Sequence, residues 1–469
     1  MRAWMRRLSV MTALATCVCA SAAAAALVQC ASVRVPVDWQ HPDGASTSLA
    51  MALLPALDQR ERAGNLLMNP GGPGGSGVQV LAFGGIMFGA PELAPLRQHF
   101  DIIGFDPRGV GDSGQVACTP SLLHDPHVSM FPSTPAQYDQ LVELDRAAGR
   151  SCQPAVLLPF VDTISAARDI DAIRAALGER TISWFGVSYG TELGQVYAAN
   201  FPHRVRAMVL DGAIDHARPV GRDAIDESSA IEHEFIRFAA WCARQTSCAL
   251  HDHDVPALFD QLNEQAERSA VVATSPHRAV TAEEITQGTY GYLYFPGDWP
   301  DLAVALRQAG GVDGSADASA LVSRAEFTDP SYGAYRAIGC HDFAPQLSGF
   351  ADLSARAALV RVAAPHMWRY SEIWDWTSGC AGWPFHALNP PRPIHVSGTP
   401  PILVVGNTYD PATPYPWARA LAAQIDNSVL LTDTVDGHTG LYNSACARQR
   451  EVDYLVSGRL PAVALTCTN

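Results

Sequence analysis

The chain has 469 residues, with 32 basic and 47 acidic side chains and a formal charge of −15. This acidic balance argues against non-specific nucleic-acid binding, which needs clustered cations against phosphates, so we expect no nucleic-acid partner. Every basic residue is an arginine, and the sequence contains no lysine. Chemistry that depends on lysine, such as a P-loop, a pyridoxal Schiff base or a Ser-Lys dyad, is therefore excluded. The length suggests two or three packing units.

The first 26 residues have the form of a secretory signal peptide. Arg2, Arg6 and Arg7 precede an apolar, alanine-rich stretch, and the small residues at 22–26 offer a cleavage site. We therefore expect an exported protein, periplasmic or extracellular, with no stable membrane insertion once residues 1–26 are removed. A membrane anchor is the alternative interpretation.

Export to an oxidising compartment favours disulfides over metal ligands. Nine cysteines follow the signal, and none stands in a C-x-x-C spacing. Chain order pairs eight of them as Cys118–Cys152, Cys242–Cys248, Cys340–Cys380 and Cys446–Cys467. This pairing leaves Cys30 without a partner.

The chain after the signal alternates strand-like and helix-like segments. Residues 163–177 place apolar side chains at helical spacing. The strand-like runs are 32–38, 48–54, 65–68, 101–105, 182–185, 205–210 and 402–405. Strands that alternate with helices predict an α/β fold with a mostly parallel central sheet covered on both faces.

Residues 216–399 interrupt this alternation with helical and aromatic-rich sequence. Helices are expected over 225–241, 256–270 and 354–369. We interpret the stretch as a large helical cap inserted between two sheet strands. The expected organisation is a signal over 1–26, a core formed by 27–215 and 400–469, and a cap over 216–399.

The pentapeptide at 186–190 fits the pattern G-x-S-x-G and stands between a predicted strand and a predicted helix. A nucleophilic serine in this context sits on a strained strand-to-helix turn, and a glycine on either side avoids clashes. We therefore predict that Ser188 is a nucleophile.

A serine hydroxyl needs a base, and the base needs an orienting acid. Asp410 closes a strand-like run, and His438 follows it in a glycine-flanked loop. This is the order of serine, acid and histidine found in α/β-hydrolases. Asp433 and Asp436 are rival acids, but they lie so close to His438 in sequence that they would need a tight local loop. Asp410 is therefore preferred.

The charge that develops on a tetrahedral intermediate needs preorganised hydrogen-bond donors. The backbone N–H of Tyr189 would supply one donor. The other would come from the glycine-rich loop at 70–74, where Gly72 is our choice, because glycine lets the backbone approach the substrate oxygen.

Two other patterns could suggest a cofactor or a metal ion, but we expect neither. The G-x-G-x-x-G matches at 72–77 and 109–114 arise easily in a chain with 37 glycines, so they do not indicate a dinucleotide site. The run His251-Asp252-His253 places no third ligand, so a solvated loop is the default interpretation.

These motifs resemble those of the S33 serine peptidases, the family of secreted α/β-hydrolases that includes prolyl and tripeptidyl aminopeptidases. The resemblance spans nearly the whole chain after the signal and includes a TAP-like C-terminal region. It rests on residues 69–77, 106–113, 186–191, 210–212, 340–342, 410–414 and 437–440, which occur in family order. It implies an α/β-hydrolase fold with Ser188, Asp410 and His438 as the triad.

The resemblance also implies an aminopeptidase that acts near free peptide N-termini. Such an enzyme must neutralise the substrate ammonium with a buried carboxylate, and the candidates are Asp342, Glu232 and Glu234. Asp342 is favoured for its place in the 340–342 motif. Two alternatives stay open: an esterase or lipase with the same triad, and an inert α/β-hydrolase scaffold used for binding. A complete triad and glycine loop weigh against the scaffold.

Overall fold

A computed structural model describes residues 28–82, 90–219, 221–268, 271–275, 277–314, 316–325, 327, 329–343, 347–460 and 464–468. The expected signal peptide, residues 1–26, lies outside these ranges. No helix in the described part of the chain is long and apolar enough to cross a membrane.

Within the described residues, nine strands form one sheet in the order β1-β2-β4-β3-β5-β6-β9-β10-β11. Their bounds are β1 Gln29–Pro36, β2 Ser46–Leu54, β3 Gly64–Asn69, β4 Phe100–Phe105, β5 Ile182–Val187, β6 Val205–Asp211, β9 Ile402–Tyr409, β10 Ser428–Asp436 and β11 Leu465–Thr468. Strands β1 and β2 run antiparallel to their neighbours, and all pairs from β4 to β11 are parallel. The predicted mostly parallel α/β sheet is confirmed.

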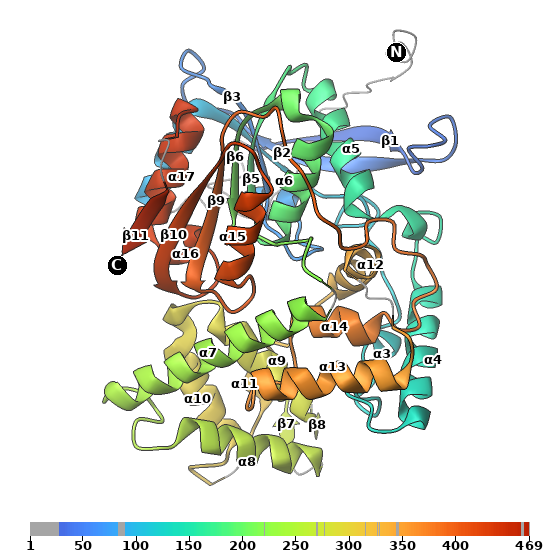
Figure 1. Ribbon diagram of the computed structural model, residues 1–469, viewed down its shortest axis with the longest axis vertical. Helices are drawn as coiled ribbons and strands as arrows, with labels where there is room; N and C mark the ends of the chain where they lie inside the picture. The colour runs from blue at the N-terminus through green and yellow to red at the C-terminus, as the bar shows by residue number, and fades with distance from the viewer. Residues whose placement is uncertain are drawn as a thin grey trace.

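Helices cover both faces of this sheet (Figure 1). One face carries α5 Thr163–Ala176, α6 Tyr189–Asn200 and α15 Tyr415–Ala423, and the other carries α1 Gly77–Ala82, α2 Ala94–His99 and α17 Ala445–Ser457. The neighbours Leu66 and Leu67 of β3 are both fully buried, in separate clusters on the two faces. This alternation explains why the central strands are continuous apolar runs in the sequence.

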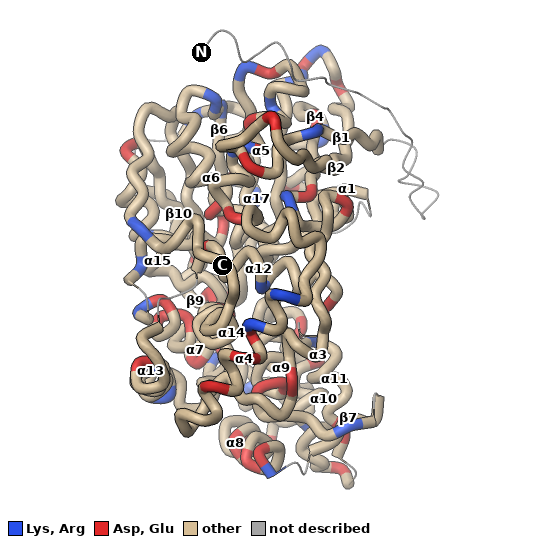
Figure 2. Tube along the Cα trace, turned by 90° about the vertical axis from the view of Figure 1, so that its right-hand side faces the viewer, with Lys and Arg blue, Asp and Glu red and all other residues tan. Residues whose placement is uncertain are grey.

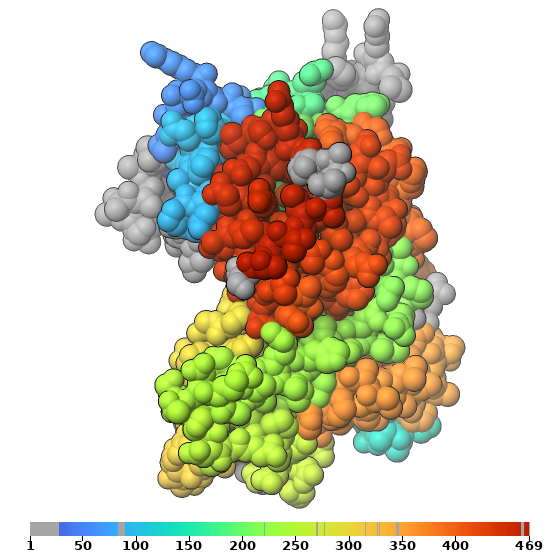
Figure 3. Space-filling model, turned by 60° about the vertical axis from the view of Figure 1, so that its left-hand side comes forward, coloured from blue at the N-terminus to red at the C-terminus, as the bar shows by residue number. Residues whose placement is uncertain are grey.

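The segment between β6 and β9 forms a helical layer at one end of the sheet, which we call the cap (Figures 1 and 3). It contains α7 Arg222–Arg244, α8 Val255–Glu267, β7 Val272–Thr274, β8 His277–Ala279, α9 Ala282–Leu293, α10 Trp299–Ala309, α11 Ser319–Val322, α12 Tyr332–Asp342, α13 Phe350–Ala363 and α14 Glu372–Gly379. Two earlier helices, α3 Pro120–Leu123 and α4 Pro135–Ser151, lie beside it, with α4 in contact with α14. The helical layer therefore draws on two parts of the chain.

One predicted helix ends earlier than expected. The sequence pattern suggested a helix over 354–369, but α13 ends at Ala363. Pro365 follows two residues later, and a proline disfavours helical backbone at the residue before it. The expectation was wrong at this end because the pattern of apolar residues continues past the proline.

Four disulfides join the pairs that chain order predicted. They are Cys118–Cys152, Cys242–Cys248, Cys340–Cys380 and Cys446–Cys467. Cys30, whose pairing chain order left open, is disulfide-bonded as well. Several disulfides in one chain are typical of proteins that fold in an oxidising compartment.

Charged residues of both signs are interspersed along the core and the cap (Figure 2). The most buried pair joins Arg108, which follows β4, to Asp169 of α5 through two hydrogen bonds of 2.7 and 2.6 Å. Both side chains are at most 1% exposed. This pair ties the turn after β4 to the helix that covers the sheet.

Candidate active site

Ser188 occupies the sharp turn between β5 and α6. Its backbone angles, φ 56° and ψ −123°, lie outside the regions that residues with a Cβ favour. The turn needs the flanking glycines: a Cβ on Gly186 would lie 2.2 Å from the Gly190 oxygen, and one on Gly190 would lie 2.7 Å from the Asn69 oxygen. The G-x-S-x-G sequence therefore forms the strained turn of a nucleophile elbow.

His438 and Asp410 come from the ends of neighbouring strands, β10 and β9. Nδ1 of His438 lies 2.9 and 3.0 Å from the two carboxylate oxygens of Asp410. Asp410 also accepts the backbone N–H groups of Ala412 and Thr413, at 2.9 and 2.8 Å. These bonds fix the carboxylate and, through it, the imidazole ring. No hydrogen bond from the described residues reaches Nε2 of His438.

Burial and nearby carboxylates act on His438 in opposite directions. Burial alone would lower the pKa of His438, but Asp410, with smaller contributions from Glu372 and Asp211, raises the pKa above its ordinary 6.5. The two rival acids have other surroundings. Asp436 pairs with Arg237 of the cap, and Asp433 is buried within β10. The carboxylate at the histidine is therefore that of Asp410.

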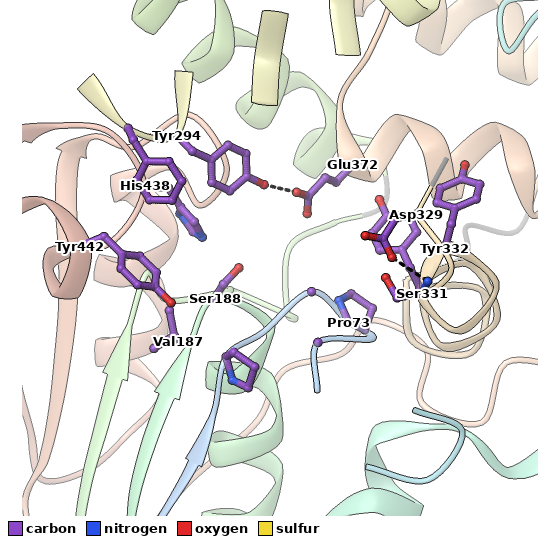
Figure 4. A pocket seen from close by; sticks show the side chains of 15 residues that line it. Pro73, Val187, Ser188, Tyr294, Asp329, Ser331, Tyr332, Glu372, His438 and Tyr442 are labelled. Carbon is purple, nitrogen blue, oxygen red and sulfur yellow. Dashed lines mark hydrogen bonds between the residues drawn. The ribbon is translucent and has the colours of Figure 1, made fainter. Parts of the chain in front are cut away.

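Ser188 and His438 face a cavity of about 300 Å³ (Figure 4). Core residues line one side of the cavity and cap residues the other. The lining residues are Pro70, Gly72, Pro73, Gly75, Val187, Ser188, Tyr294, Phe295, Asp329, Ser331, Tyr332, Tyr335, Glu372, His438 and Tyr442. The cavity therefore brings the serine and the histidine together with an aromatic wall and two carboxylates.

The glycine loop after β3 forms the core side of the cavity beside Ser188. A Cβ on Gly71 would lie 2.9 Å from the Cβ of Ser188, so glycine is required for this approach. Gly72, with φ +110°, lines the cavity itself. Asp106 holds the end of the loop by accepting the Ser76 hydroxyl at 2.6 Å and the Val78 N–H at 3.1 Å. The glycines at 72–77 thus serve close backbone packing.

The run at 251–253 does not gather metal ligands. Nδ1 of His251 contacts the Cys242 carbonyl oxygen at 3.3 Å, and Asp252 and His253 are exposed. In the part of the chain that the structure describes, no group of three or more His, Cys, Asp or Glu side chains could hold a metal ion.

Asp342, the favoured candidate for binding an ammonium group, lies away from the cavity. Its carboxylate accepts the backbone N–H and the hydroxyl of Thr163, at 3.1 and 2.6 Å. It is fully buried, and burial raises its pKa to about 7. The expectation does not fit, because protein donors already occupy this carboxylate and anchor α12 to α5.

Glu232 and Glu234 are also occupied by backbone donors. Glu232 accepts the N–H groups of His366 and Met367, both at 3.0 Å. Glu234 accepts the N–H of Gly437 at 3.0 Å, one residue before His438. Neither glutamate lines the cavity, so neither is placed to meet a substrate there.

Glu372, the first residue of α14, is the carboxylate that sequence reasoning missed. It lines the cavity opposite Ser188 and accepts the hydroxyl groups of Tyr294 and Tyr290, the latter at 3.0 Å (Figure 4). Burial raises the pKa of Glu372, and the Tyr294 bond and nearby His438 partly oppose this. The other carboxylate of the cavity, Asp329, is exposed. Nothing local in the sequence separates Glu372 from the other cap glutamates.

The chain is similar to several proteins of known name. A family model described as TAP-like protein matches residues 366–467. Serine protease Hip1 of Mycobacterium tuberculosis is 31% identical over 467 aligned residues, which cover 93% of this chain and 87% of that protein. Carboxylesterase B of the same species is 33% identical, with 94% and 86% covered. Tripeptidyl aminopeptidase of Streptomyces lividans is 31% identical, with 94% and 83% covered.

The sheet order, the turn at Ser188 and the inserted cap define an α/β-hydrolase. Identity above 30% over nearly the full length establishes the family more narrowly. The chain belongs to the S33 family of serine peptidases and is a TAP-like member of it. It is therefore a serine hydrolase of the peptidase class.

Proposed function

We propose that the chain is an aminopeptidase that hydrolyses peptide bonds near free N-termini, with Ser188 as nucleophile, His438 as base and Asp410 as orienting acid. The support is the strained turn that presents Ser188, the Asp410–His438 contact and the shared cavity. Nε2 of His438 has no hydrogen bond from the described residues, and the bond between nucleophile and base in hydrolases often tightens only when substrate binds.

In this mechanism the Ser188 hydroxyl attacks the scissile carbonyl carbon, and Nε2 of His438 takes the hydroxyl proton. The Asp410 carboxylate stabilises the imidazolium that forms. His438 then gives the proton to the leaving amine, and water hydrolyses the acyl-enzyme by the same route. The oxyanion would be met by the N–H groups of Tyr189 and Gly72, each donor contributing about 3–4 kcal/mol to the lowering of the barrier.

The observation that carries the aminopeptidase proposal is the position of Glu372. An ammonium group that enters a protein cavity loses water, and a carboxylate there offsets this cost. Glu372 faces the cavity that holds Ser188 and His438, and two tyrosine hydroxyls fix its orientation. A peptide whose ammonium meets Glu372 would place a bond near its N-terminus at Ser188.

An esterase is the second candidate, because one relative at 33% identity is named Carboxylesterase B. Hydrolysis of a neutral ester would use the same serine, histidine and acid. It would have no use for a carboxylate in the cavity, which favours the peptidase.

The domain boundaries and the compartment belong to the same proposal. A signal over 1–26 would direct export, and the core parts 27–215 and 400–469 would carry the triad. The cap over 216–399 would shape the peptide site. The disulfides support an oxidising destination, the periplasm or the medium.

Matched fluorogenic peptides with free and acetylated N-termini test the proposal. We expect the wild-type protein to cleave only the free peptides and Ser188→Ala to cleave neither. Equal turnover of both forms, or of simple esters alone, would favour the esterase. If wild type and Ser188→Ala were both inactive on every substrate, the binding scaffold would be the better account.

A further inference from the structure

Asp211, the last residue of β6, connects the two halves of the proposed triad. Its backbone oxygen accepts the N–H of Ser188 at 2.8 Å. Its carboxylate accepts the N–H groups of Gly440 and Leu441, at 2.9 and 2.7 Å, just after His438. A single buried residue thus holds both the turn of the nucleophile and the loop of the base.

A second buried acid lies against this carboxylate. Glu451 of α17 is fully buried, and the neighbouring Asp211 carboxylate helps to raise its pKa. Neither carboxylate oxygen of Glu451 receives a donor from the described residues. Two neighbouring buried carboxyl groups can share a hydrogen bond only if one of them keeps its proton. Burial raises the pKa of Glu451 well above its usual range and that of Asp211 to about 6.

We propose that Asp211 is a positioning residue for the catalytic serine and histidine, and that protonated Glu451 holds the Asp211 side chain through a shared proton. The inference rests on the triad of the proposed function. It goes further, because neither residue lines the cavity or touches His438 by a hydrogen bond. The hydrogen bonds of Asp211 reach the two catalytic segments through their backbone, and its charge also helps to raise the pKa of His438.

The surroundings of the pair set the direction of its pH dependence. Charged and titratable groups near Asp211 are His438, Asp410 and Tyr442, and those near Glu451 are Arg448 and Asp433. Loss of the shared proton at alkaline pH leaves two buried carboxylates that repel each other. The loop of His438 would then lose its anchor, and the reaction of Ser188 would slow. Without the shared proton, the triad predicts that the reaction rate of Ser188 stays constant at alkaline pH, because His438 remains neutral.

The test measures how fast a fluorophosphonate labels Ser188, a reaction that needs the triad but no substrate ammonium. In Asp211→Asn an NH2 group replaces one carboxylate oxygen, so the N–H of either Gly440 or Leu441 loses its acceptor and faces another donor. We expect at least tenfold slower labelling, and a fall in kcat for peptide substrate with KM changed less than twofold.

Asp223→Asn is the matched control. Asp223 is also buried, accepts two backbone N–H groups, from Gly221 and Ala224, and has a pKa raised to about 6. It stands at the start of α7 and does not line the cavity. We expect a similar loss of thermal stability with labelling at the wild-type rate. Equal labelling rates for the two variants would overturn the positioning role.

Glu451→Gln tests the shared proton even if Asp211→Asn does not fold. Glutamine donates an N–H to Asp211 at every pH, so the alkaline fall in the labelling rate seen with wild type should disappear. The shared proton would be ruled out if the wild-type labelling rate stayed constant up to alkaline pH. It would also be ruled out if the labelling rate of Glu451→Gln fell at alkaline pH as the wild-type rate does. Failure of the proposed function itself would look different: wild type and Ser188→Ala would label alike.

Discussion

The basicity of the His438 side chain depends on the carboxylates around it. The ring is almost fully buried, which by itself favours the neutral form. The Asp410 carboxylate, fixed by backbone N–H groups of its own loop, opposes this most strongly, and with Glu372 and Asp211 it raises the pKa of His438. In the proposed mechanism Asp410 would therefore orient the base and help to set the pH at which it becomes active.

This balance predicts the acid side of the pH profile. The base must be neutral, so kcat/KM should rise with pH through an apparent pKa above 6.5, the ordinary value for histidine. Asp410→Asn should move this midpoint to lower pH and reduce kcat by about 10⁴-fold. Rate measurements from pH 5 to 9 decide the matter. A wild-type midpoint at or below 6.5, or an unshifted midpoint in the variant, would contradict this role of Asp410.

The residues of the proposed triad could be found from the sequence because each belongs to a local pattern. Ser188 has its flanking glycines, and Asp410 and His438 follow strand-like runs in the required order. Glu372 has no such pattern, because its position depends on how α14 packs over the cavity. Asp342 had the stronger motif, yet its carboxylate bonds to Thr163, a contact between segments far apart in the sequence.

At the scale of elements, the turn after β4 is built around the buried guanidinium of Arg108. Besides its two bonds to Asp169, it donates to the Val37 carbonyl oxygen at 2.7 Å. The same turn contains Asp106, which holds the glycine loop beside Ser188. The resemblance at 106–113 therefore reflects a structural support of the active site.

Removing one partner of this pair should be strongly destabilising. Arg108→Leu leaves the Asp169 carboxylate buried without its cation, at a cost of about 3–5 kcal/mol in the free energy of unfolding. Replacing both residues by leucine should recover part of the loss. Denaturant unfolding measures both, with Arg307→Ala at the exposed Arg307–Asp313 pair as a control that changes little. If Arg108→Leu were as stable as wild type, the stabilising role of the Arg108–Asp169 ion pair would be contradicted.

The elements themselves were predictable to different degrees. The buried strands appeared as apolar runs because both faces of a parallel sheet are covered. The helix α4, Pro135–Ser151, gave no such signal, because only a few of its residues are buried. Its place beside the cap comes from contacts with α14, which no local pattern encodes.

At the scale of the whole molecule, core and cap each supply part of the site. The core provides Ser188 and His438, and the cap provides Glu372. The disulfide Cys340–Cys380 joins α12 to the end of α14, the two cap helices that line the cavity. The distance between the carboxylate and the serine is therefore fixed by how the cap sits on the core, and this distance would select the bond that is cleaved.

The most direct measurement compares wild type and Glu372→Gln on one peptide with a free and with an acetylated N-terminus. We predict that KM for the free peptide rises at least tenfold in the variant, about 1.4 kcal/mol or more of lost binding, because the ammonium loses its counter-charge. Asp329→Asn, at the other carboxylate of the cavity, should change KM far less, and fluorophosphonate labelling of Ser188 in Glu372→Gln should show that the triad is intact. Unchanged cleavage of the free peptide by Glu372→Gln would contradict the account.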